Sequence, residues 1–309
     1  MQRPAITLLP QLGYLRISGA DADGFLQGQL CNDIGLLTPR RAQISAYNSP
    51  KGRMLAVFHL LRDDGAVLAE VDRGVLEPVL KRLRMFVLRS KVTLEDISAK
   101  TGALGLAGAA APELLAQLEL PAPAQALDCI RDEASGLIVV RRFGELPRYT
   151  LHGNSGAIAE MMTRLAPDAV AANPGDWPRQ DILAGVPTVY PQTSDHFVPQ
   201  MANLDLLGGI SFSKGCYTGQ EIVARLHYLG QLKRRMVICH CEATGVEPGT
   251  AVYDGGEPQA VGEVVQSAPR GPGSVIAIVL QLSHAGSTQL CLGQPQGTPL
   301  GAPESVPAA

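Results

Sequence analysis

The chain has 309 residues, of which 46% are apolar and 18% charged, and its formal net charge is −3. This profile is typical of a folded globular protein, and it excludes a disordered chain and a general polyanion-binding domain, which usually carries a basic excess. A chain of this length favours two or three domains, each with a buried core.

The sequence also predicts a soluble, cytoplasmic protein. The N-terminal segment lacks the apolar run and the cleavage pattern of a signal peptide. The run MLAVFHLL ends after eight residues at Arg62, well short of the ~18–20 apolar residues that cross a bilayer. The six cysteines are sparse and irregularly spaced, which indicates reduced thiols rather than a disulfide framework.

Residues 1–100 are predicted to form a first lobe that mixes hairpins and helices. Two short strands within 6–20 predict a hairpin, and a helix with Asp21 or Asp23 as its N-cap follows. Three more strands with tight turns, the first at 49–52, lead to an amphipathic helix and a last strand. This mixture favours the α+β class with an antiparallel sheet.

Residues 101–190 are predicted to form a second α+β lobe. A proline-punctuated connection at 121–125 follows a short helix. The segments GLIVVRRF and RYTLHG are plausible paired strands, and SGAIAEMMTRLA is a helix with Ser155 as its cap candidate.

The remainder of the chain divides into three predicted segments. Residues 191–232 hold a distinctive loop and helix, 233–295 consist of short strands that predict a small antiparallel β-barrel, and 296–309 form a Gly/Pro/Ala-rich tail predicted to be disordered. The triplet Cys239-His240-Cys241 alternates as a strand does and has no partner pair with zinc-type spacing. Buried strand cysteines are therefore favoured, and no metal site is predicted.

The loop and helix contain the stretch GGISFSKGCYTGQEIVAR, residues 208–225. Thr218 and Glu221 fit a capping box at the start of the helix. Cys216 precedes this cap, so the positive helix end and the Lys214 ammonium favour its thiolate, while the Glu221 carboxylate opposes it. The alternative interpretation is that Cys216 only packs.

The octapeptide KGCYTGQE, with FVPQMANLDLLGGISF before it and ARLHYLGQLKRR after it, resembles the YgfZ family of folate-binding proteins. These proteins are relatives of the glycine-cleavage T-protein, and their eukaryotic members assist iron–sulfur cluster assembly. The segments LRISGADADGFLQGQLCNDI and NSPKGRMLAVFHLL carry a weaker similarity. The candidate site residues are Cys216 and Lys214 for chemistry, and Tyr217, Gly219, Gln220, Glu221, Arg225, Asn203, Gln200 and Phe212 for ligand binding.

The resemblance implies two lobes of the aminomethyltransferase folate-binding type and a C-terminal barrel, arranged as a ring of three domains around a central opening. It implies a tetrahydrofolate-type ligand in a pocket of the first lobes, with residues 191–232 packed on these lobes.

Two positions depart from the related sequences. Met54–Val57 stands where T-proteins carry an aspartate pair that supports aminomethyl transfer, so glycine-cleavage activity is not expected. Leu183 stands where a glutamate contacts the pterin ring, and a leucine accepts no hydrogen bond. Asp181 is a possible substitute acceptor, although a surface or N-cap role explains it equally well.

The leading hypothesis is a folate-binding accessory protein for assembly, maintenance or repair of iron–sulfur enzymes, including radical enzymes that modify tRNA. Its partners are a reduced folate and iron–sulfur client enzymes or assembly factors. The alternative is a folate-dependent one-carbon transferase, with Asn48, Asn203 and Asp205 as its polar candidates. No turnover reaction follows from the sequence.

A third hypothesis is direct binding of tRNA through basic side chains. A solvated basic face is favoured instead, because the chain as a whole is acidic. The side chains are Lys81, Arg82, Arg84, Arg89 and Lys91, with Lys233, Arg234 and Arg235.

Overall fold

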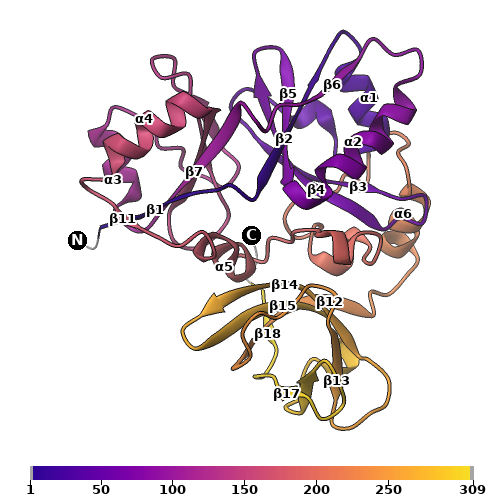
Figure 1. Ribbon diagram of the computed structural model, residues 1–309. Helices are drawn as coiled ribbons and strands as arrows, with labels where there is room; N and C mark the ends of the chain where they lie inside the picture. Colours follow the sequence, from indigo (N-terminus) through magenta and orange to yellow (C-terminus); the bar gives the residue numbers. More distant parts are fainter. Residues whose placement is uncertain (1–2, 307–309) are drawn as a thin grey trace. The chain divides into compact units, whose positions relative to one another are not determined.

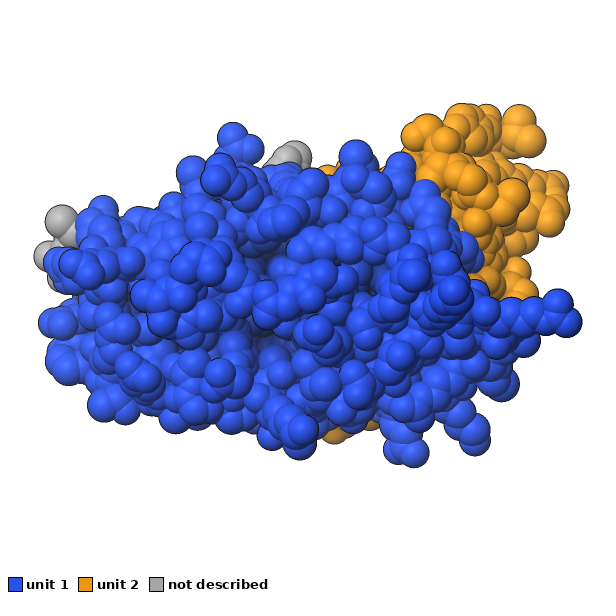
Figure 2. Space-filling model, turned by 90° about the horizontal axis from the view of Figure 1, so that it is seen from above, with its two compact units in different colours: residues 1–28, 33–44, 58–177 blue, residues 29–32, 45–57, 178–309 orange. Residues whose placement is uncertain are grey.

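The structure is a computed structural model that describes residues 3–306 (Figure 1), and the chain forms two compact units. Figure 2 shows unit 1 in blue and unit 2 in orange. Unit 1 comprises residues 1–28, 33–44 and 58–177, and unit 2 comprises residues 29–32, 45–57 and 178–309. The chain thus enters unit 2 twice before it remains there from residue 178 onward. The finer division and the three-domain ring expected from the sequence stay predictions.

Unit 1 contains a six-stranded sheet in the order β11-β1-β7-β10-β9-β8. β1 pairs in parallel with β11, whereas its pairing with β7 and the pairings among β7, β10, β9 and β8 are antiparallel. Helix α4 packs on β7 and β10, and buried residues of α3 and α4 join the core of this sheet. The elements are β1 Ala5–Leu8, β7 Thr101–Ala107, α3 Ala111–Gln117, β8 Cys129–Arg131, β9 Ile138–Arg141, β10 Arg148–Asn154, α4 Ser155–Leu165 and β11 Val170–Ala171.

A five-stranded sheet has the order β3-β4-β5-β2-β6, and its strands β3 and β4 pass from one unit into the other. Helix α2 packs on β2, β5 and β6, and its buried residues include Val75, Val79 and Leu83, whose four-residue spacing puts them on one face. The elements are β2 Leu12–Ser18, α1 Ala22–Gln29, η1 Ile34–Leu36, β3 Gln43–Asn48, β4 Met54–Asp63, β5 Ala66–Asp72, α2 Arg73–Val87 and β6 Thr93–Asp96.

Two local predictions in unit 1 are wrong. β1 and β2 do not form a hairpin, because β1 pairs with β7 and β2 pairs with β5 and β6. The N-cap of α4 is Asn154 rather than Ser155, since the Asn154 side chain accepts a hydrogen bond from the Ala157 N–H.

Unit 2 is built on a seven-stranded antiparallel sheet in the order β17-β16-β13-β14-β15-β12-β18. The predicted α+β class is confirmed, and the predicted C-terminal antiparallel β-barrel is present as a half-barrel sheet with β17 and β18 at its two edges. The elements are α5 Asp176–Leu183, η2 Pro191–Thr193, η3 Pro199–Ala202, α6 Gln220–Tyr228, β12 Arg234–Cys241, β13 Ala251–Asp254, β14 Gly262–Arg270, β15 Gly273–Gln281, η4 Leu282–His284, β16 Leu290–Leu292, β17 Thr298–Pro299 and β18 Glu304–Ser305.

The prediction that the tail from residue 296 is disordered is wrong for residues 296–306. β17 pairs with β16 and β18 pairs with β12, so the tail up to residue 306 supplies both edge strands of the sheet. Residues 307–309 lie outside the described part of the chain.

The cysteines of β12 behave as a strand pattern predicts. Cys239 is fully buried in the core of the seven-stranded sheet, while Cys241 packs against that core. Across residues 3–306, no cluster of three or more His, Cys, Asp or Glu side chains is arranged to hold a metal ion. No helix in the same range is long and apolar enough to cross a bilayer.

Candidate functional site

The signature loop, residues 208–219, is anchored on the segment 29–32 within unit 2. The Lys214 ammonium donates to the carbonyl oxygens of Leu30 at 2.7 Å and Asn32 at 2.8 Å. The Asn32 side-chain amide donates in return to the Gly208 carbonyl at 2.7 Å. Because Lys214 is 9% exposed, these bonds replace water around a buried cation and fix the path of the loop.

Tyr217 covers the same lysine. The Lys214 Nζ lies 5.2 Å from the centre of the Tyr217 ring, within the range of a cation–π interaction. Tyr217 is buried, and this burial raises the pKa of its phenol far above the ordinary value, so that the ring stays neutral. Lys214 and Tyr217 thus hold the loop on both sides of Cys216.

Cys216 is exposed between these two buried neighbours. The thiol is thus presented to solvent from a loop whose flanking side chains point inward. Stabilisation of a thiolate at Cys216 by Lys214 stays a prediction, and the contacts of Lys214 show an additional role, which is to hold the loop to Leu30 and Asn32.

A second cysteine, Cys31, lies beneath the loop and was missed by the sequence reasoning. Its thiol donates to the Gly209 carbonyl at 3.2 Å and accepts from the Ala46 N–H at 3.2 Å. Cys31 is fully buried, and burial raises the pKa of its thiol despite the opposing hydrogen bonds and the nearby Lys214. Cys31 is therefore a neutral structural thiol, and no local pattern around it in the sequence indicates this partner.

The predicted capping box at the start of α6 is wrong. The N-cap is Gly219, at φ +79°, and no side chain caps the helix. A Cβ on Gly219 would lie 2.5 Å from the Ser49 carbonyl oxygen and 2.8 Å from the Gly52 Cα. Gly219 is thus required because the helix start packs directly against the backbone of the turn at 49–52.

The segment before the loop is also fixed from within unit 2. Gln200 donates from Nε2 to the Val223 carbonyl at 2.7 Å, which ties η3 to α6. Asn203 adopts a left-handed conformation and accepts from Arg235 at 3.1 Å, while Asp205 and Arg235 form an ion pair at 2.9 Å. Asn203 and Asp205 are therefore engaged with β12.

The remaining predicted residues lie on or beside the outer face of α6. Phe212 stacks on His227 with ring centres 3.7 Å apart, and the Tyr228 hydroxyl donates to the Phe212 carbonyl. Glu221 and Arg225 are exposed, and Gln220 is half-buried. The structure therefore brings Lys214, Tyr217 and Gly219 into packed contacts and leaves Glu221 and Arg225 in solvent.

One buried amide near the loop lacks partners. Asn48, the last residue of β3, is fully buried, and neither its Oδ1 nor its Nδ2 has a hydrogen-bond partner within residues 3–306. Ser49 and Arg53, which follow it, close the hairpin through a backbone hydrogen bond of 2.8 Å. An amide in this state is costly, since an unsatisfied buried polar group costs about 1–3 kcal/mol, and a polar ligand would satisfy it.

Leu183, the position expected to weaken folate binding, ends α5 and is 41% exposed. Its side chain provides no hydrogen-bonding group, as the sequence indicates. Asp181 lies in the same helix, and its carbonyl accepts from the Val186 N–H.

The basic side chains considered for tRNA binding occur in both units. In unit 1, Lys81 and Arg89 are exposed, whereas Arg84 donates to the Leu94 carbonyl. In unit 2, Arg235 is held by Asp205. A role of these residues in binding tRNA stays untested.

Comparison with known proteins identifies the family. The chain is 32% identical over 243 residues to the "tRNA-modifying protein YgfZ" of Colwellia psychrerythraea, and the match covers 76% of this chain and 74% of that protein. The protein of the same description from Escherichia coli is 36% identical over 222 residues, which cover 71% and 67% of the two chains. The chain belongs to the YgfZ family. No protein-family model matches the chain.

The fold of this YgfZ family member is shared with a solved enzyme. The glycine cleavage system aminomethyltransferase T from Bartonella henselae superimposes with a TM-score of 0.80, covering 99% of this chain and 86% of that enzyme at 14% identity. The predicted aminomethyltransferase-like fold is therefore confirmed, and identity this low shows the fold alone.

Proposed function

We propose that this YgfZ family member is a folate-binding accessory protein that supports iron–sulfur enzymes, including enzymes that modify tRNA, through the thiol of Cys216. The observation that carries the proposal is the exposed Cys216 between Lys214 and Tyr217, both of which are buried and tied to the body of unit 2. A structural cysteine would instead be buried, as Cys31 is.

The chemistry proposed for Cys216 is thiol exchange with a client. A thiolate attacks a disulfide sulfur and forms a mixed disulfide, and the second sulfur of the client leaves as a thiolate. A single cysteine does not hold a stable cluster, which usually needs four protein ligands, so contact with a cluster requires ligands from the client. The relatives described as tRNA-modifying proteins support clients of this kind.

The thiol is tested by genetic complementation. In a strain that lacks its own family member, Cys216→Ser is expected to lose most restoration of iron–sulfur enzyme activity and of tRNA modification. Cys291→Ser, at another incompletely buried cysteine, is the matched control and is expected to restore both fully. Full restoration by Cys216→Ser overturns the role of the thiol.

The proposal of a reduced folate as ligand rests on the fold and on Asn48. A pterin ring carries N–H donors and acceptors, and the unpartnered Asn48 amide offers the complementary groups. Leu183 does not fit the ring in this way, so we expect weak binding.

Calorimetry with tetrahydrofolate tests the ligand. Asn48→Leu is expected to weaken binding by about tenfold, which corresponds to roughly one hydrogen bond to a buried group. Leu183→Glu is expected to strengthen it, whereas Leu206→Glu, at another partly exposed leucine of unit 2, is the control without effect. Equal affinity in all variants contradicts this location of the ligand.

A one-carbon transferase is the second candidate, and Asn48 is the observation that favours it. The other two polar candidates, Asn203 and Asp205, are engaged by Arg235. Turnover of an aminomethyl donor with tetrahydrofolate, lost in Asn48→Leu, would establish this candidate in place of the accessory role.

A further inference from the structure

Unit 1 holds a pocket of about 440 Å³ that shares no residue with the candidate site in unit 2. Its walls come from the end of β1, the start of β2, the start of α2, the segment that leads into β7, and α4. The volume falls in the range of about 300–1,000 Å³ that is common for small-molecule sites. A ligand of small-molecule size therefore fits the pocket.

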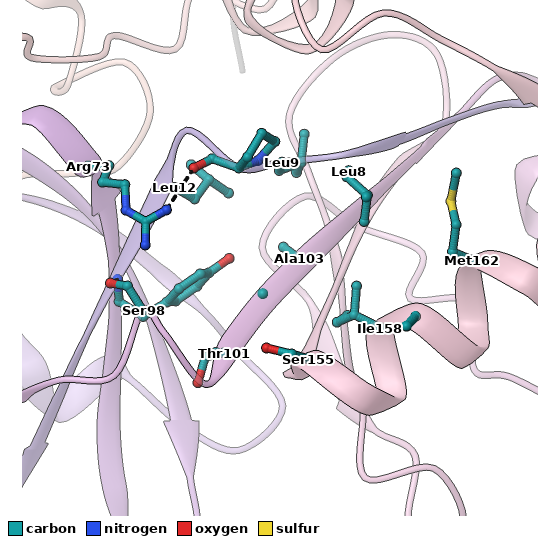
Figure 3. Close-up of a pocket in the computed structure, with 14 residues that line it drawn as sticks. Leu8, Leu9, Leu12, Arg73, Ser98, Thr101, Ala103, Ser155, Ile158 and Met162 are labelled. Atoms are coloured by element: carbon teal, nitrogen blue, oxygen red, sulfur yellow. Dashed lines mark hydrogen bonds between the residues drawn. The ribbon is translucent and has the colours of Figure 1, made fainter.

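In Figure 3 the guanidinium of Arg73 lies on one side of the pocket, and the other side is mainly apolar, with Ser155 as its polar group. Arg73 and Ser98 lie on one side, whereas Leu8, Ile158 and Met162 lie on the other. Leu8 is 46% exposed, so the apolar side presents hydrophobic surface to the pocket opening. Removing such surface from water is favourable, which favours an occupant with an apolar body.

The charge of the lining indicates which polar group the ligand carries. Arg73 is the only charged residue among the residues that line the pocket. Its Nη1 donates to the Pro10 carbonyl at 3.4 Å, and no carboxylate in the described range 3–306 forms an ion pair with its guanidinium. An unpaired guanidinium at the rim of an apolar pocket favours a carboxylate, which it binds in a bidentate manner.

Tyr14 adds a second polar group to the same wall. It lies two residues after Leu12, on the same face of β2, and Leu12 pairs with Asp72, the residue before Arg73. The Tyr14 side chain is buried, and its hydroxyl has no hydrogen-bond partner within residues 3–306. Burial and the facing Glu70 raise the pKa of the phenol, so it remains a neutral donor.

We propose that this pocket binds an amphipathic monocarboxylate of the medium-chain fatty-acid type, with its carboxylate at Arg73 and its chain along Leu8, Ile158 and Met162. A neutral lipid leaves Arg73 without a counter-charge, and an organic cation is repelled by it. The pocket lies in unit 1, so this binding is independent of the function proposed for Cys216.

Calorimetry of the full chain with sodium decanoate, below the concentration at which decanoate forms micelles, tests the proposal. Saturable binding is expected, with decanol at least about tenfold weaker and decyltrimethylammonium weaker still. Arg73→Gln is expected to weaken decanoate binding by about tenfold and to leave decanol unchanged. Arg40→Gln, at an exposed arginine outside the pocket, is the matched control.

A second pair of variants tests the location without disturbing the core. Ala159 is exposed on α4 and lines the pocket, so Ala159→Trp is expected to fill the pocket and abolish binding. Ala116→Trp, at an exposed alanine of α3 outside the pocket, is expected to bind decanoate normally. Thermal unfolding of all variants verifies that each is folded.

Three outcomes overturn the proposal: no saturable uptake of decanoate, equal affinity in Ala159→Trp and the wild type, or equal affinity in Arg73→Gln and the wild type. Vesicles of phosphatidylcholine with and without oleate separate the free acid from a membrane surface. Sedimentation with oleate vesicles without uptake of free decanoate also counts against the pocket.

Discussion

Two buried cations, Arg142 of unit 1 and Lys214 of unit 2, are satisfied by different kinds of partner. In unit 1, Arg142 donates to both carboxylate oxygens of Glu70, at 3.1 and 3.3 Å, and both side chains are nearly inaccessible. In unit 2, Lys214 donates to the backbone carbonyls of Leu30 and Asn32. The first cation neutralises a charge within the core, whereas the second fixes the backbone of the loop that carries Cys216.

The largest expected effect comes from breaking the ion pair of unit 1. Arg142→Leu leaves the Glu70 carboxylate buried without its partner, which should lower the free energy of unfolding by about 3–5 kcal/mol. Urea denaturation measures this. Replacing both partners, as Glu70→Leu with Arg142→Leu, should lose much less, and Arg40→Gln at the surface should lose under about 0.5 kcal/mol.

The next effect concerns the cation of unit 2. Lys214→Met leaves the carbonyls of Leu30 and Asn32 without this donor, at a cost of about 2–4 kcal/mol if both stay unsatisfied. Hydrogen exchange should also become faster in the signature loop and unchanged in β7 of unit 1. Lys51→Met, at an exposed lysine of unit 2, is the control. Loss of stability without faster exchange in the loop contradicts the anchoring role.

Two buried histidines of unit 1, His152 and His59, also predict that the stability of the protein decreases in acid. Burial, and then the charge of Arg142, lowers the pKa of His152 to about 3, and burial together with Arg142, Arg148 and His152 lowers the pKa of His59. The unfolded chain takes up these protons near pH 6.5 and the folded chain does not. Stability is therefore full above pH ~6.5 and falls below it, by about 1.4 kcal/mol per pH unit for each histidine, until the folded-state pKa is reached.

Urea denaturation between pH 7 and 5 measures this slope. His152→Leu should remove about half of it, because one of the two protons is no longer taken up on unfolding. A slope that His152→Leu leaves unchanged places the titration in other residues.

The sequence predicted the elements of both units well, because their signals are local. The strands flanking the turn at 49–52 and the amphipathic spacing in α2 are readable from neighbouring residues. The pairing of β1 with β7 depends on residues about a hundred positions away, so the apparent hairpin within 6–20 was wrong.

The candidate site shows the same limit. The motif KGCYTGQE placed Cys216, Lys214 and Gly219 in one loop, but the carbonyl partners of Lys214 lie far earlier in the chain, at Leu30 and Asn32. The predicted capping box is wrong because Gly219, which packs closely on Gly52, is the N-cap in place of Thr218. Long-range backbone contacts of this kind leave no periodic pattern in a sequence.

A smaller loss of stability is expected from a substitution at Gly219, where the start of α6 packs on the turn at 49–52. Gly219→Ala introduces a Cβ at φ +79° and 2.5 Å from the Ser49 carbonyl oxygen, which should cost about 1–3 kcal/mol. Gly215→Ala lies in the same loop, and apart from its chain neighbours no atom of residues 3–306 is within 4 Å of the added Cβ, so it should change stability by under about 0.5 kcal/mol. Equal costs in urea denaturation would show that the contact between Gly219 and the turn does not constrain the loop.

The smallest effect on stability is expected for a substitution of Cys216. The largest difference in thiol reactivity is expected between Cys216 and Cys31. Cys216→Ser should change the free energy of unfolding by under about 0.5 kcal/mol, because the thiol is exposed. In the native protein a disulfide reagent such as Ellman's should modify Cys216 readily, whereas Cys31, buried and protonated, should react only on unfolding. Mass spectrometry of the labelled chain separates the two sites. Because Lys214 holds the loop that presents Cys216, Lys214→Met should increase the rate at which the reagent modifies Cys31. Labelling of Cys31 at the wild-type rate would show that anchoring of the loop by Lys214 does not protect this thiol.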